Sequence, residues 1–163
     1  IANDGADSAQ SWAQGVVANF ARPPQGNDTA NTEAVASGEC RFSIVNTYYL
    51  PKVEKEAPGT LDNIGIIFPN QDTTGTHINI SGAGVLVNAP NRGNAIRFLE
   101  YLTEPQAQSY FANGNNEYPA VTGVEAASAV EALGTFRPDT LNAGRIGEGQ
   151  AEAVRIFDRA GWN

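Results

Sequence analysis

The stretch "RFSIVNTYYLPKVEKEA", residues 41–57, predicts a strand, a turn and a helix in immediate succession. Residues 41–46 are rich in β-branched and aromatic side chains, which is typical of a strand. Pro51 would lose a backbone hydrogen bond deep inside a helix, so we expect a turn over 46–50 and a helix that begins near the proline. A strand that leads into a helix in this way indicates an α/β protein.

The rest of the chain alternates between the same two patterns. Short apolar or β-branched runs predict further strands, and helical spacing of apolar residues predicts further helices. A turn-rich stretch, 69–77, separates two groups of strands. Within the predicted helices, Asn27 or Asp28 should cap one start, while Thr103 should cap another helix that stops at Gly114. The further strands are 63–68, 77–80 and 84–88, and the further helices fall within 8–22, 27–39, 91–102, 103–114, 125–133 and 148–161.

The adjacent pair Tyr48 and Tyr49 lies at the corner between the predicted strand and helix. Neighbours on a strand point to opposite faces, and neighbours on a helix diverge by about 100°. Only a turn, or the first turn of a helix, lets two adjacent phenols converge. Tyrosines at such a corner often serve packing and hydrogen bonding. The alternative is a hard, highly charged cation, because phenolate is an anionic oxygen donor that such an ion would stabilise.

Composition excludes several classes of function. The chain has 163 residues, 41% of them hydrophobic, and a net charge of −8, which argues against binding to nucleic acid or an anionic membrane surface. No signal peptide is recognisable, and the first residue is Ile1, so we expect a longer or processed chain. Cys40 is the one cysteine and His77 the one histidine of the sequence, so an internal disulfide and a multi-histidine metal site are excluded. An enzyme that uses a tyrosine as general acid or base is disfavoured, since no nucleophile–base motif or cofactor loop is present.

Four long blocks of the sequence together resemble one known family. They are "VVANFARPPQGND", "NTYYL", "FPNQDTTGTHINISGAGV" and "NAIRFLEYLTEPQAQSYFANGNNEYPAV". In this order they resemble the ferric-ion-binding proteins of bacterial ABC transporters, which are class II periplasmic binding proteins with two lobes and a cleft. The resemblance implies a non-enzymatic protein that binds ferric iron (Fe3+) for uptake and works with an ABC transporter permease. It also implies a location in the periplasm, or a lipid anchor outside the cytoplasmic membrane.

The resemblance also assigns site residues. In that family an adjacent tyrosine pair binds ferric iron through both phenolates, which implies that Tyr48 and Tyr49 are metal ligands. Asn46 matches a position that binds a synergistic anion such as carbonate or phosphate in some members, and Asn27 matches a second such position. Other members use no anion. A relative that carries an oxyanion or another small solute is the alternative within the same class.

The chain departs from the family in length, since members are about twice as long and the N-terminal half is the part without a counterpart. That half supplies the other iron ligands, so we expect weak iron binding by these residues alone. By analogy, residues 1–78 and 130–163 form most of the tyrosine-bearing lobe, and 79–129 cross into the other lobe. Strand edges left without partners would favour pairing with another chain. If these residues completed the iron shell alone, His77 and Glu117 would be the first candidates.

Overall fold

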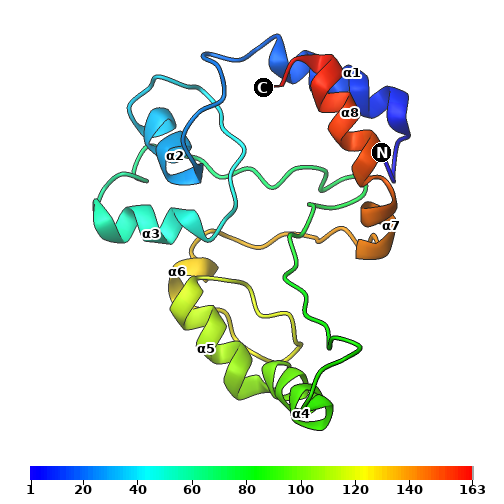
Figure 1. The fold of residues 1–163 in the computed structure, drawn as a ribbon. Helices are drawn as coiled ribbons and strands as arrows, with labels where there is room; N and C mark the ends of the chain where they lie inside the picture. The colour runs from blue at the N-terminus through cyan, green and yellow to red at the C-terminus, as the bar shows by residue number, and fades with distance from the viewer. Residues whose placement is uncertain (163) are drawn as a thin grey trace.

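The computed structural model describes residues 1–162, and within them eight helices are joined by long extended segments (Figure 1). The helices alternate with these segments along the whole chain, as the sequence patterns predict. Their bounds are α1 (Ala6–Val17), α2 (Asp28–Ala36), α3 (Tyr49–Glu56), α4 (Arg92–Leu102), α5 (Pro105–Asn115), α6 (Ser128–Glu131), α7 (Ala143–Glu148) and α8 (Gln150–Ala160). None of these described helices has the length and apolar character that a membrane span requires.

The predicted sheet does not form within residues 1–162. The expected strands 41–46, 63–68, 77–80 and 84–88 have no strand ladder, and the last of them ends in a turn. Among the described residues the one β-bridge is a parallel contact of Thr76 with Pro138. The strand predictions are therefore wrong for this chain, and the α/β class is seen only in part. A β-branched pattern favours an extended backbone, but a ladder also needs a neighbouring strand, and these segments do not pair with one another.

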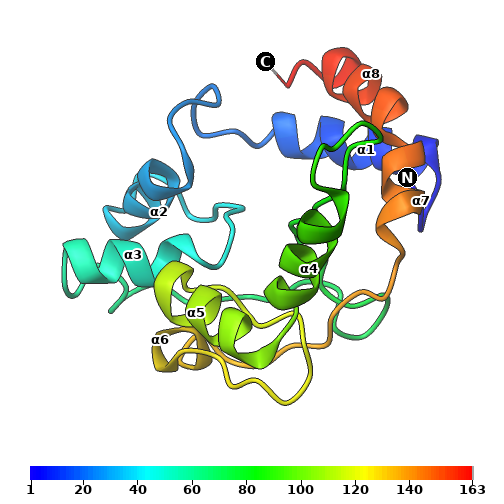
Figure 2. The ribbon, with the colours of Figure 1, turned by 60° about the horizontal axis from the view of Figure 1, so that its bottom comes forward.

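The helices pack in small groups instead of around one core. In Figures 1 and 2, α8 lies beside α1 and α7, α2 lies beside α3, and α5 lies beside α4 and α6. Aromatic rings join the first group: Trp162 packs on Trp12, Phe20 and Phe157 with ring centroids 5.0–6.0 Å apart. The segments at the two ends of the described chain are thereby held side by side.

A compact joint ties residues 69–76 to residues 137–139. The backbone N–H of Thr76 donates to the carbonyl of Arg137, and the Arg137 guanidinium donates to the carbonyl of Gln71 at 2.7 Å. The side-chain amide of Gln71 accepts a hydrogen bond from the Arg137 backbone N–H at 2.7 Å and donates one to the Arg137 carbonyl at 3.1 Å. Gly75 is required here, because its φ is +96° and a Cβ would lie 2.6 Å from the Pro138 carbonyl oxygen.

The helix predictions succeed in place and miss some ends. Asn27 caps α2 as predicted, accepting from the N–H of Ala30 at 3.1 Å. Thr103 does not cap α5, because its hydroxyl donates back to Glu100 at the end of α4. The helix also passes Gly114 and ends at Asn115, and the capping residue Asn116 adopts the left-handed conformation with φ +57°. Predicted helices at 8–22, 125–133 and 148–161 are shorter, and α7 was not predicted.

Candidate metal site

The tyrosine pair lies where α3 begins, as the sequence predicts. Two turn hydrogen bonds precede the helix, from the Tyr49 N–H to the Asn46 carbonyl at 3.3 Å and from the Leu50 N–H to the Thr47 carbonyl at 3.1 Å. The helix starts at Tyr49, two residues before Pro51. The proline is tolerated because backbone N–H groups in a first turn have no partner within the helix.

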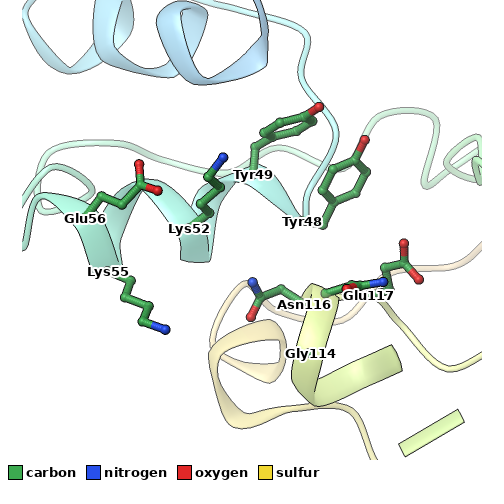
Figure 3. A pocket seen from close by; sticks show the side chains of 9 residues that line it. Tyr48, Tyr49, Lys52, Lys55, Glu56, Gly114, Asn116 and Glu117 are labelled. Carbon is green, nitrogen blue, oxygen red and sulfur yellow. The ribbon is translucent and has the colours of Figure 1, made fainter. Parts of the chain in front are cut away.

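Both phenols open into one cavity of about 640 Å³. Their ring centroids are 4.4 Å apart and the ring planes meet at 33°. Figure 3 shows the two hydroxyls pointing in a similar direction, away from the axis of α3. The convergence expected of a helix start is therefore present. The two phenol oxygens point in similar directions, as binding to one shared ion would require. The cavity is lined by Tyr48, Tyr49, Lys52, Lys55, Glu56, Gly114, Asn115, Asn116 and Glu117.

The surroundings of Tyr48 favour its protonated form. The nearby Tyr49 hydroxyl is the largest cause, followed by partial loss of water and by the negative charges of Asp28 and Glu117, and together they raise the pKa of Tyr48 to about 12. Both carboxylates oppose a phenolate there when no cation is present. A cation bound at the phenols would be attracted by the same charges, so this end of the cavity is suited to positive ions.

The residues expected to bind an anion are engaged elsewhere in the fold. The backbone and side-chain N–H groups of Asn46 both donate to the Asp28 carboxylate, at 2.8 and 2.9 Å, and its amide oxygen accepts from Asn79 at 3.2 Å. Asn27 serves as the cap of α2. After these bonds are counted, one hydrogen remains on the Asn46 amide nitrogen and both remain on that of Asn27, whose oxygen alone makes the cap. Their anion-binding role stays a prediction.

The far wall of the cavity comes from a segment that sequence patterns did not connect with the tyrosines. Asn116 and Glu117 follow the last turn of α5, more than sixty positions along the chain. The left-handed Asn116 turns the backbone out of the helix, and Glu117 is half-buried beside the cavity. No local pattern reveals this meeting, because it depends on how the chain returns after α5. Lys52 and Lys55 were missed for a simpler reason: exposed lysines on a helix are usually a solvated face.

His77 lies in a different place. It lines a second cavity of about 180 Å³ together with Asp139 and Ile146, and it does not line the cavity of the phenols. Within residues 1–162, no cluster of three or more histidine, cysteine, aspartate or glutamate side chains is arranged to hold a metal ion. Of the candidate ligands that the sequence analysis names, Tyr48, Tyr49 and Glu117 line the cavity of the phenols.

Comparison with known proteins assigns the chain to a family. A family model described as bacterial extracellular solute-binding protein matches residues 2–138. The chain belongs to this family. It is a family of solute-binding proteins and not of enzymes, in agreement with the expectation from the sequence.

Relatives narrow the assignment. The chain is 45% identical to iron uptake protein A1 of Synechocystis, over 99% of the chain and 46% of that protein. A Trichodesmium protein (IdiA, FutA) solved with iron and citrate matches with a TM-score of 0.92 and 47% identity, over 98% of this chain and 52% of that one. The Campylobacter jejuni ferric binding protein matches with a TM-score of 0.90 and 38% identity, over 100% of this chain and 53% of that one.

These likenesses confirm the resemblance to ferric-ion-binding proteins and the overall fold of the matched part. The chain spans about half the length of the curated relatives it matches. The names of these relatives say what those proteins bind.

Proposed function

We propose that this chain is part of a ferric-ion-binding protein that serves iron uptake through an ABC transporter, with Tyr48 and Tyr49 as phenolate ligands. The observation that carries the proposal is the shared cavity of the two adjacent phenols at the start of α3. Names of relatives that are 38–47% identical to this chain over nearly its whole length, two of them with the same fold, support the same cargo. The permease partner and a periplasmic or lipid-anchored location follow from the same class of protein.

The chemistry suits ferric iron better than a divalent ion. A phenol keeps its proton at neutral pH, and a trivalent ion is needed to displace it effectively. Two phenolates supply only part of the coordination sphere, so the other protein ligands would come from the part of the relatives that this chain does not span. Iron binding by the 163 residues alone should therefore be weak and should be lost in acid.

A synergistic anion, bound through Asn46 or Asn27, is one mode for such a site. The Trichodesmium relative was solved with citrate beside iron, which is consistent with an accompanying anion. Against this mode, the Asp28 carboxylate lies 2.9 Å from the Asn46 amide nitrogen and would repel carbonate or phosphate. We therefore favour binding without an anion at Asn46.

The alternative cargo is an oxyanion or another small solute. The observation that favours it is the pair Lys52 and Lys55, whose side chains line the same cavity. Colour separates the two cargoes, because ferric tyrosinate absorbs visible light and a bound oxyanion does not.

The test is a titration with ferric nitrilotriacetate, followed in the visible region. Wild-type protein should develop a charge-transfer band, while Tyr48→Phe and Tyr49→Phe should each weaken binding and shift or fade the band. Tyr110→Phe is the matched control, since Tyr110 is 74% exposed on α5 and does not line the cavity. If both site variants bind as tightly as wild type, the pair serves packing alone.

The two-lobed arrangement remains part of the proposal, with residues 1–78 and 130–163 in one lobe and 79–129 crossing into the other. Large apolar side chains along the extended segments support pairing of this chain with a second copy when it is studied alone. Sedimentation should then show a dimer or larger species, and a monodisperse monomer would contradict the pairing. The side chains concerned are 60–93% exposed: Phe42, Ile44, Ile67, Ile80, Leu86 and Val87.

A further inference from the structure

Glu117 holds a position in the cavity that the phenol pair does not explain. It comes from the segment after α5, so it faces the phenols from the opposite wall (Figure 3). The residue is half-buried, and within residues 1–162 it takes part in no salt bridge. A carboxylate that loses part of its water without a cationic partner carries a desolvation cost, which a bound cation would offset.

The other charged groups around the cavity divide into two sets. Lys52, Lys55 and Glu56 come from α3; the Lys52 amino group lies beside Tyr49, and Lys55 and Glu56 lie farther along the helix (Figure 3). The negative charges that raise the pKa of Tyr48 are those of Asp28 and Glu117. Of these two carboxylates, Asp28 already accepts two hydrogen bonds from Asn46. Glu117 is therefore the carboxylate left to respond to a guest ion.

We propose that Glu117 supplies a third negative charge to the ferric site, from the wall opposite the tyrosine pair. The inference rests on the proposed function. Two phenolates leave a ferric ion with a net charge of about +1, and an ionised Glu117 nearby brings the assembly to neutrality. The charge also favours a trivalent over a divalent ion, because two phenolates alone already neutralise a divalent ion.

The expected effect follows from Coulomb's law. A unit charge within about 8 Å, one Debye length, of a site with a net charge of about one changes affinity about five- to thirtyfold at effective dielectric constants between about 40 and 20. Glu117→Gln removes the charge and keeps the shape. Glu117→Asp keeps the charge and retracts it by one methylene group.

The experiment is a visible-band titration of the chain with ferric nitrilotriacetate at low salt, for wild type and three variants. Glu117→Gln should bind about five- to thirtyfold more weakly, and the deficit should shrink at high salt. Glu117→Asp should recover most of the affinity, and Glu100→Gln, a control at an exposed carboxylate of α4 that does not line the cavity, should match wild type.

Each outcome decides the proposal. Wild-type affinity in Glu117→Gln overturns the inference and leaves the phenolate site intact. An equal loss in Glu117→Gln and Glu117→Asp overturns it as well, since shape and not charge would then matter. Absence of a visible band in wild type, even at saturating ferric nitrilotriacetate, refutes ligation by the two phenolates of this chain, and the inference with it. Circular dichroism of each variant shows that a loss of binding does not come from unfolding.

Discussion

Proton release on iron binding gives the sharpest test of Tyr48 as a phenolate ligand. The pKa of Tyr48 is raised to about 12 in the iron-free chain, chiefly by Tyr49. At pH 7 only about one molecule in 10⁵ then carries a Tyr48 phenolate. Ligation through the phenolate must therefore release one whole proton from this residue.

The sign of the pH dependence follows directly. Because the raised pKa favours the protonated form, the proton competes with the ion, so affinity rises with pH and falls in acid. Each released proton changes affinity about tenfold per pH unit, and two phenols would give about 100-fold per unit. The dependence should continue without a plateau between about pH 5 and pH 8, since that whole window lies far below the pKa of Tyr48.

Calorimetric titrations with ferric nitrilotriacetate, in buffers of different ionisation enthalpy, count the protons released. Wild type should release one proton more than Tyr48→Phe at saturating concentration. The comparison cancels protons exchanged by the chelator, because it contributes equally to both titrations. Tyr110→Phe should match wild type. The reasoning is refuted if Tyr48→Phe saturates with iron and releases as many protons as wild type.

Three further predictions concern the fold. Val53→Ala removes two carbon atoms from a side chain that is 2% exposed, and it should lower the free energy of unfolding by about 2 kcal/mol in urea titrations. Gly75→Ala should lower the melting temperature more than Gly38→Ala, since both have positive φ but only Gly75 abuts the Pro138 carbonyl. Glu54 accepts two backbone N–H bonds that lower its pKa below the ordinary 4.5, so its stabilisation is present above 4.5 and lost as pH falls through the lowered value. Glu54→Gln should remove that part of the acid dependence in pH-dependent thermal melts.

Local features of the fold were predictable because their causes are local. The turn before α3 follows from Pro51, and the cap of α2 follows from the side chain of Asn27. The end of α5 was misjudged because Asn116, not Gly114, takes the left-handed conformation, and asparagine tolerates it nearly as well as glycine. The sequence could not show whether segments such as 63–68 would find a sheet partner, since pairing depends on residues distant in the chain.

The candidate site likewise has one part with a local cause, which the sequence predicts, and one part that depends on distant residues. The tyrosine pair was predictable because adjacency and a helix start are enough to make two phenols converge. Glu117 reaches the cavity only through the path of the chain between α3 and α5, on which Gln71 is held by its hydrogen bonds with Arg137 from the segment after α6.

That path decides how the two walls of the cavity are spaced. Helix contacts run mainly within groups, α2 with α3 on the tyrosine side and α4 with α5 on the Glu117 side. The connection between the sides is made by extended segments, and the hydrogen bonds of Gln71 and Arg137 lock two of them together where they cross. An ion held by phenolates from one wall and attracted by a carboxylate on the other would draw these walls together about that crossing. Under the proposed function, binding energy and the spacing of the walls are thus coupled, because phenols that are neutral in the empty cavity would lose their protons only when a trivalent ion lies between them and the carboxylate.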